Sequence, residues 1–317
     1  MSRTIALTGA TGFIGGVLAR RLETIGWQIR ALVRPASLGA RYAGTATQWI
    51  EGDLEDLDSL RRLVNNDVYA VVHCAGAVRG ASQAQFDGVN VDGVARLVQA
   101  AREQHQMPRF LLISSLAARE PHLSPYAASK RQGENTLAMA AGDMNWAVLR
   151  PSAVYGPGDK ELLPLFRWIG RGIAPILGSR SARFSLLYVE DLAESVVQWL
   201  NSDTNERRAF ELHDGHPDGY AWHDVVDTVA QLYDRLVFRI QVPVVILRLL
   251  AGLNLGAAQI FGYAPMLTPG KVRELNHSNW VCNNDALTHE TGWAPQFSLE
   301  EGLRRTLLTP LSSRGGT

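Results

Sequence analysis

Two spacings of apolar residues alternate along the first half of the chain. Short apolar runs are each followed by a stretch in which apolar positions recur every three or four residues. The runs stand at 5–7, 29–33, 69–73, 110–114 and 146–149. They predict buried strands, and the stretches between them, such as 57–64, 91–105 and 131–141, predict amphipathic helices. Because parallel strands need crossover connections, the alternation predicts an α/β fold with a doubly wound parallel sheet.

The second half of the chain is less regular, and glycine and proline residues punctuate it. An apolar run at 185–189 indicates one more strand that returns to the sheet. We therefore expect a sheet domain at 1–150 plus about 184–205. A smaller, discontinuous second region would take up about 151–183 plus 206–317.

Residues 240–270 contain a single charged side chain, Arg248. Gly252, Asn254 and Gly256 are expected to interrupt this apolar stretch, so no transmembrane segment is predicted. We favour one or two helices buried in the second region. The alternative is that residues 244–261 line a channel for an apolar substrate or touch a membrane surface.

The composition of the chain argues against several classes of function. The chain has 317 residues, and 31 Lys and Arg balance 31 Asp and Glu, so no general attraction to nucleic acid is expected. Its two cysteines, Cys74 and Cys282, form no CxxC pair, and no motif supplies metal ligands. We expect no metal site. The N-terminus lacks the apolar run of a signal peptide, which predicts a cytoplasmic location.

The turn after the first strand contains Gly9, Gly12 and Gly15. Such glycines let the chain turn tightly and let a pyrophosphate approach the start of the next helix. Thr11, Phe13 and Ile14 complete the turn. A glycine-rich turn without a ligand is the alternative, but the strand before and the helix after it favour a dinucleotide site in a Rossmann-type domain. The second region would then bind the substrate.

The end of the second strand decides between the two nicotinamide cofactors. An acid there binds the ribose 2′-hydroxyl of NAD, whereas a cation accommodates the 2′-phosphate of NADP. The sequence has Arg34 at this point and no acid before Glu51. Although such an arginine can be a solvated surface charge, we predict NADP(H) as the preferred cofactor and NAD(H) as the alternative.

Eight short motifs occur in the order typical of one enzyme group: TGATGFIG, GDL, HCAG, NVDG, ISS, YAASK, RPSAVYGPGD and YVEDLA. With them, nearly the whole chain resembles the extended short-chain dehydrogenase/reductase superfamily, which includes nucleotide-sugar epimerases, 3β-hydroxysteroid dehydrogenases and dihydroflavonol-type reductases. The resemblance implies a homodimer that packs the helices following Val91 and Tyr126. It implies further contacts: Asp53 and Leu54 with the adenine, Ala75 and Gly76 with the dinucleotide, Asn90 beside the active site, and Pro151, Ala153 and Val154 along the nicotinamide.

The chemistry is expected at Ser115, Tyr126 and Lys130. Tyr126 and Lys130 are four positions apart and share a helix face, so the ammonium should lower the pKa of the phenol. Tyr126 would then exchange a proton with the substrate oxygen, to which Ser115 donates a hydrogen bond. In the family the lysine also holds the nicotinamide ribose, and the second serine of the pair, here Ser115 rather than Ser114, is the donor. A core tyrosine with a surface lysine is the alternative.

Three departures from the sugar-processing branches bear on the substrate. Ser115 and Tyr126 are only eleven positions apart, where sugar enzymes carry a longer loop. Leu116 and Ala117 occupy the places where dehydratases carry an Asp-Glu pair. Arg183 is shifted by one residue from the position of the pyrophosphate-binding cation, which would turn it to the other strand face.

These features favour an oxidoreductase that reduces a ketone, or oxidises the alcohol, on a largely apolar lipid- or sterol-like substrate. Hydride would pass from the nicotinamide while Tyr126 moves the proton. One alternative is a nucleotide-sugar C4 epimerase with bound NAD. Another is a non-catalytic NADP(H)-binding regulatory or assembly protein.

Overall fold

A seven-stranded parallel sheet forms the centre of the protein. The computed structural model describes residues 3–308 except 41–46, 66, 180 and 206. The strands lie in the order β11-β6-β5-β4-β1-β2-β3, and every pair is parallel. Their bounds are β1 (Thr4–Thr8), β2 (Gln28–Val33), β3 (Gln48–Glu51), β4 (Val68–His73), β5 (Arg109–Ile113), β6 (Trp146–Pro151) and β11 (Ala209–Leu212). The predicted fold class is confirmed.

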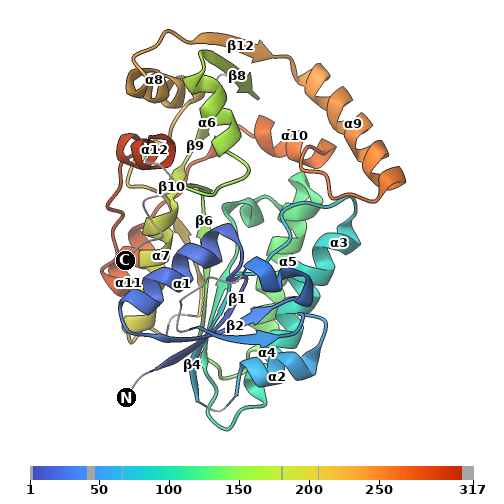
Figure 1. Ribbon diagram of the computed structural model, residues 1–317, viewed down its shortest axis with the longest axis vertical. Helices are drawn as coiled ribbons and strands as arrows, with labels where there is room; N and C mark the ends of the chain where they lie inside the picture. The colour runs from blue at the N-terminus through green and yellow to red at the C-terminus, as the bar shows by residue number, and fades with distance from the viewer. Residues whose placement is uncertain (1–2, 41–46, 66, 180, 206, 309–317) are drawn as a thin grey trace.

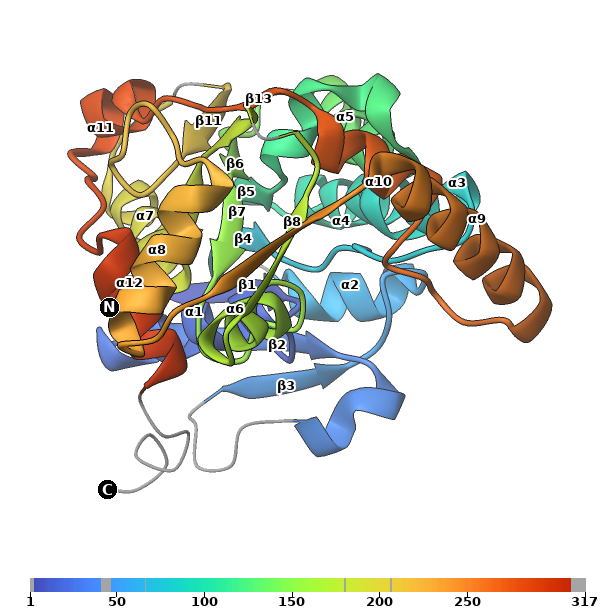
Figure 2. The same cartoon turned by 90° about the horizontal axis from the view of Figure 1, so that it is seen from above.

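Helices cover both faces of this sheet (Figures 1 and 2). One face carries α1 (Phe13–Thr24), α7 (Val189–Asn201) and α11 (Asp285–Thr291), whose Leu18, Trp199 and Leu287 are fully buried with the strands. The other face carries α2 (Leu57–Leu63), α4 (Gly93–Arg102) and α5 (Pro125–Ala140). Burial of both faces explains why the strands are almost continuously apolar.

Short helical turns connect β4 to α4 and β5 to α5. They are α3 (Gln83–Asp87) and the π-helical turn η2 (Gly88–Asp92) before α4, and the 3₁₀ turns η3 (Leu116–Arg119) and η4 (Pro121–Leu123) before α5. A further 3₁₀ turn, η1 (Pro35–Ala40), follows β2. Ser124 caps α5, since its hydroxyl accepts a hydrogen bond from the main-chain nitrogen of Ala127 at 3.0 Å. Tyr126 therefore lies in the first turn of α5.

The second region stands at the carboxyl end of the main sheet (Figure 1). It contains three two-stranded ribbons and several helices. The ribbons pair β7 (Ala153–Tyr155) with β10 (Leu186–Tyr188), β8 (Ile173–Leu177) with β12 (Phe238–Val242), and β9 (Arg183–Phe184) with β13 (Asn279–Trp280). The helices are α6 (Leu163–Gly170), α8 (Trp222–Leu232), α9 (Val244–Phe261), α10 (Pro269–Asn276) and α12 (Leu299–Leu307).

Two details of the predicted organisation are wrong. The strand expected at 185–189 pairs with β7 and does not return to the main sheet. The edge strand of that sheet is β11 instead, so the sheet extends beyond the predicted boundary at about 205. A sequence pattern shows where a strand lies but not which neighbour it pairs with.

The prediction for residues 240–270 is also wrong. Gly252, Asn254 and Gly256 do not interrupt the stretch, because α9 runs unbroken for 18 residues. Nor is this a buried helix: only 17% of it lies inside the protein, and by length and composition alone it could cross a membrane. Glycine weakens a helix by about 1 kcal/mol, which tertiary contacts and a long apolar neighbourhood can offset.

Candidate active site

The glycine-rich turn between β1 and α1 packs so closely against neighbouring backbone that a side chain would clash. A Cβ at Gly9, where φ is +76°, would lie 2.6 Å from the main-chain nitrogen of Ala75. One at Gly15 would lie 2.1 Å from the main-chain oxygen of Gly9. Only glycine fits both places. Gly12 begins α1, whose first turn has no acidic side chain, so its main-chain N–H groups suit a phosphate.

Polar contacts fix the end of β4 next to this turn. The Ala75 nitrogen donates to the Thr8 hydroxyl at 3.2 Å, and that hydroxyl contacts Nδ1 of His73 at 2.7 Å. His73 is completely buried, and burial lowers its pKa to about 3. The ring is therefore neutral and has a structural role here.

Lys130 and Asn90 converge on Gly76, just after β4. A Cβ at Gly76 would lie 3.0 Å from Nζ of Lys130 and 3.2 Å from Oδ1 of Asn90. Lys130 Nζ donates to the main-chain oxygen of Ile113 at 3.1 Å. Asn90, on the π-helical turn η2, accepts from the Ala77 nitrogen at 2.9 Å and donates to its oxygen at 3.0 Å. The structure thus brings these residues together.

Ser115 and Tyr126 meet at the carboxyl end of β5. The Ser115 side chain lies near the Tyr126 hydroxyl, where it acts to lower the pKa of the phenol, and it accepts a hydrogen bond from the Ala117 nitrogen at 3.2 Å. Phe86 on α3 packs edge-on against the Tyr126 ring, with centroids 6.1 Å apart. Ser114 instead donates to Glu134 at 2.6 Å and is buried. Ser115 is therefore the serine that faces the tyrosine.

The protonation of the two key groups differs from the sequence-based expectation. Burial raises the pKa of Tyr126 above its ordinary value, although the Ser115 side chain and the charge of Lys271 oppose this. Lys130 does not lower it. Burial lowers the pKa of Lys130 to about 8. The charges of Cys74 and Glu134 raise this pKa and offset the effect of burial only in part. The expectation was wrong because it considered charge without desolvation.

The remaining predicted cofactor residues lie along the same edge of the sheet. Arg34 is exposed directly after β2, and Asp53 and Leu54 follow β3. Pro151 ends β6, while Ala153 and Val154 lie on β7. Phe13 and Ile14 open α1, and Thr11 precedes them. Because carboxyl ends of parallel strands share an edge, the turn, Arg34 and the nicotinamide-side residues could hold one extended dinucleotide.

Two charged residues beside Tyr126 were not expected from the sequence. Lys271 and Glu274 are on α10, and Lys271 Nζ donates to Glu274 Oε2 at 2.9 Å. Glu274 also accepts a hydrogen bond from the hydroxyl of Ser124, the residue that caps α5. No motif marks them, and only their i, i+3 spacing on a helix could have suggested the pair.

Two sequence-based arguments about the substrate can be compared with the structure. Arg183 is turned to Asp224, with 3.4 Å between Nη1 and Oδ2. Leu116 and Ala117 are buried in η3, so no carboxylate pair follows Ser115. Within the described parts of the chain, no three His, Cys, Asp or Glu side chains are grouped to hold a metal ion.

The model of the NAD-dependent epimerase/dehydratase family matches residues 5–212. Ceramide reductase from Caulobacter vibrioides is 35% identical over 96% of this chain and 93% of its own. UDP-glucose 4-epimerase from Vibrio cholerae is 27% identical over 96% and 95%. The crystal structure of UDP-glucose 4-epimerase from Thermotoga maritima with UDP-glucose, 19% identical, has a TM-score of 0.75 over 96% and 97% of the two chains and shows the same fold.

The family's cofactor is NAD(H), and the start of α1, which has no acidic side chain in its first turn, suits the phosphates of a dinucleotide. The roles of the individual side chains remain predictions. The chain belongs to the NAD-dependent epimerase/dehydratase family and is an NAD(P)-dependent oxidoreductase of the extended short-chain dehydrogenase/reductase type.

Proposed function

We propose that the protein is an NADPH-dependent reductase that converts a ketone on a largely apolar, ceramide-like lipid into a secondary alcohol. The observation that carries this proposal is the pair of hydroxyls of Ser115 and Tyr126 at the carboxyl end of β5. Because the pKa of Tyr126 is raised, its phenol is protonated at neutral pH and suits proton donation to a carbonyl oxygen.

The residues of this site divide the work of the reaction. When bound, the reduced nicotinamide supplies the hydride for the carbonyl carbon. Ser115 holds the carbonyl oxygen by a hydrogen bond that strengthens as negative charge develops. Tyr126 gives its hydroxyl proton to that oxygen, which completes the alcohol. Lys130 binds the nicotinamide ribose, and the Lys271 ammonium, whose charge acts on the phenol, favours the phenolate until solvent returns the proton.

The choice of substrate rests on similarity and on what surrounds the site. The ceramide reductase resembles this chain over nearly its full length. The second region contributes α9, which is largely apolar, and no long loop separates Ser115 from Tyr126. Arg183, engaged with Asp224, leaves one fewer cation for a sugar pyrophosphate. These points support a lipid over a nucleotide sugar.

NADPH is proposed over NADH because Arg34 is exposed at the end of β2, where a guanidinium can grip the 2′-phosphate. We also propose that the protein works in the cytoplasm as a homodimer. Neither proposal is needed for the chemistry of Ser115, Tyr126 and Lys130.

To test this, the protein is given NADPH and a 3-oxo-ceramide in mixed micelles. NADPH consumption is followed by the absorbance of the reduced nicotinamide, and the mass of the lipid product is measured by mass spectrometry. We expect one NADPH consumed for each lipid that gains two hydrogens. In parallel, UDP-glucose is given with NAD. Interconversion to UDP-galactose without net cofactor consumption would instead establish the epimerase. Cofactor binding with no turnover of any ketone would favour the regulatory or assembly protein.

A further inference from the structure

Helix α9 presents its apolar side chains outward. It lies at the periphery of the molecule in both views (Figures 1 and 2). Ile260 and Phe261 are 79% and 77% exposed. The other exposed large apolar residues of the helix are Val245, Ile246, Leu249, Leu250 and Leu253. Seven exposed large apolar side chains on one helix are unusual, because a contiguous exposed apolar patch often marks a binding surface.

The outward residues form one face. At 100° per residue, the seven exposed side chains fall within an arc of about 160°, and Leu247, Ala251 and Ala258 point to the opposite side. The inward three contact the rest of the second region, where Leu247 and Ala251 pack with Val272 of α10. Polar side chains lie only at the borders between the two faces. One side of the helix is apolar toward the protein and the opposite side is apolar toward the exterior, with polar side chains between them. Such a helix suits a position between a protein and a lipid phase.

The ribbon of β8 and β12 extends this apolar face. Ile173 is the direct partner of Phe238, and both are exposed, as is Ile240. Further along the same ribbon, Leu177 and Val242 pack against the cluster beneath α9. The exposed apolar residues of β12 thus lie on the strand that runs directly into α9.

The charges are strongly unequal in the stretches of chain that contain and flank the β8–β12 ribbon and α9, although the whole chain is neutral. Residues 163–178 and 232–263 contain five arginines and one acid, Asp234. The arginines are Arg167, Arg171, Arg235, Arg239 and Arg248. Arg239 is paired with Asp227, and the others leave a local positive excess. Such an excess attracts anionic lipid headgroups.

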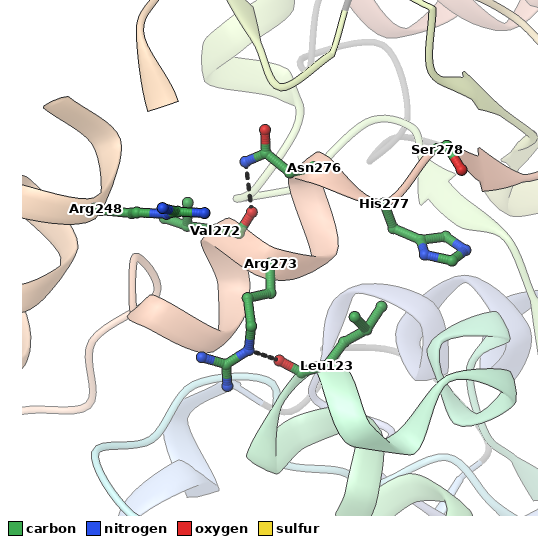
Figure 3. A pocket seen from close by; sticks show the side chains of 7 residues that line it. All are labelled: Leu123, Arg248, Val272, Arg273, Asn276, His277 and Ser278. Carbon is green, nitrogen blue, oxygen red and sulfur yellow. Dashed lines mark hydrogen bonds between the residues drawn. The ribbon is translucent and has the colours of Figure 1, made fainter. Parts of the chain in front are cut away.

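The one charged side chain of α9, Arg248, lines a surface pocket that also contains a second arginine. Arg248 and Arg273 line this pocket of about 350 Å³ together with Asn276 and His277, and no acidic residue lines it (Figure 3). Arg273 is fixed there by its bond to the main-chain oxygen of Leu123 at 2.7 Å. A lipid phosphate in this pocket would leave its acyl chains beside the apolar face of α9.

We propose that the outward face of α9 and the β8–β12 ribbon docks on a bilayer that contains anionic lipids, with α9 lying along the membrane surface. A second copy of the chain is the weaker candidate for this surface. The 18-residue helix offers a strip about 27 Å by 10 Å and the five-residue ribbon one of about 17 Å by 10 Å, together roughly 450 Å². A stable protein interface needs about 800 Å² from each partner.

Contacts within the second region oppose a spanning orientation. Asn254 donates to the main-chain oxygen of Leu267 at 2.8 Å and accepts from the Tyr263 hydroxyl at 2.6 Å. Through Val272, α9 is held against α10, whose Glu274 bonds to Ser124. Insertion across the bilayer would break these contacts or draw α10 away from α5. Delivery of a lipid ketone from the bilayer past α10 is a consequence that rests on the proposed function, whereas the docking does not.

The test measures co-sedimentation of the full-length chain with vesicles of phosphatidylcholine alone or with one quarter phosphatidylglycerol. We expect binding to the anionic vesicles that weakens with salt. The double change Leu249→Glu and Leu253→Glu should reduce the apparent affinity at least tenfold, and Arg248→Gln about fivefold. Met107→Glu, at a 47% exposed position between α4 and β5, is the control and should bind like the unaltered protein. Circular dichroism establishes that each variant is folded.

Four results would overturn the proposal, the last of them a spanning helix. The first is no binding of the unaltered chain to either vesicle, and the second is equal binding by the Leu249→Glu, Leu253→Glu variant. The third is a change of oligomeric state in that variant, seen by light scattering without vesicles, which would assign the surface to a second copy. Resistance to alkaline extraction would show a spanning helix. Turnover of a short-chain, water-soluble ketone tests the proposed reductase separately from the docking. We expect this turnover to be unchanged in the Leu249→Glu, Leu253→Glu variant. If neither the variant nor the unaltered protein turns the ketone over, the result counts against the reductase and not against the docking.

Discussion

The Lys130 ammonium donates a hydrogen bond to the main-chain oxygen of Ile113 at 3.1 Å. This bond ties the first turns of α5 to the end of β5, two residues before Ser115. It fixes the lysine beside Gly76, where a dinucleotide would pass. The same burial that positions the side chain makes its positive charge easier to lose.

The pH dependence of reduction should therefore report on Lys130. Its pKa is lowered to about 8, so the ammonium is present below that pH and lost above it. The phenol of Tyr126, whose pKa is raised, stays protonated over this range. We expect kcat/KM for ketone reduction to fall about tenfold per pH unit above about 8. In Lys130→Arg, residual activity should lose this limb, because arginine stays charged; an unchanged limb would assign it to another group.

Loss of the Tyr126 hydroxyl should abolish turnover without affecting the cofactor. Tyr126→Phe keeps the ring that packs on Phe86 but removes the proton donor, so we expect kcat to fall by about 10³. Ser115→Ala should cost about 10². Fluorescence titration should give an NADPH Kd within twofold of the unaltered protein for both. More than one tenth of the activity in Tyr126→Phe would point to a different acid, with Lys271 the nearest candidate.

Arg34 should decide the cofactor. Removing a guanidinium from a phosphate loses a charge-assisted hydrogen bond, so Arg34→Ala should weaken NADPH about 10- to 100-fold. The Kd for NADH should change less than twofold. Arg304→Ala, which removes an exposed arginine on α12, is the control and should alter neither value. Tighter binding of NADH than NADPH by the unaltered protein would refute the assignment.

Two glycines with opposite surroundings should respond oppositely to alanine. Gly9→Ala places a Cβ 2.6 Å from the Ala75 nitrogen at a φ of +76°, and we expect a loss of about 2 kcal/mol or more in the free energy of unfolding. Gly252→Ala, inside α9 with nothing within 4 Å, should gain about 0.5–1 kcal/mol. Urea denaturation measures both. A stable Gly9→Ala with full NADPH affinity would contradict the tight turn.

Glu274 should position the helix that carries Tyr126. Glu274→Gln weakens both the bond to Ser124 and the pair with Lys271, so we expect kcat to fall about tenfold while the NADPH Kd stays unchanged. Glu300→Gln on α12, which loses only an exposed ion pair, should leave kcat unchanged. An equal loss in kcat and in NADPH affinity would indicate general unfolding rather than displacement of Tyr126.

The central sheet could be predicted because each of its main strands is an uninterrupted apolar run between polar turns. β3 and β11 could not, since Gln48–Glu51 is only half-buried at one edge and Ala209–Leu212 pairs with β6 far back in the sequence. The state of α9 was missed for another reason. Periodicity shows that a segment is apolar, but burial depends on what else packs there, and little does.

At the site, spacing placed Ser115, Tyr126 and Lys130 together, because a strand end and a helix start define their geometry. It did not find Lys271 and Glu274, which reach Tyr126 from a helix about 150 residues later in the chain. Nor could it give the direction of the shift in the pKa of Tyr126, because desolvation depends on the folded surroundings.

The two 3₁₀ turns η3 and η4 fill the whole interval between Ser115 and Tyr126, so this side of the site has no loop of its own. Lys271 and Glu274 of α10 stand next to the tyrosine in its place. The proposed catalytic residues and these charged neighbours are thus encoded in separate stretches of the gene. Exchange of the segment around α10 between relatives offers a way to redirect such a reductase to a new ketone while its catalytic residues stay untouched.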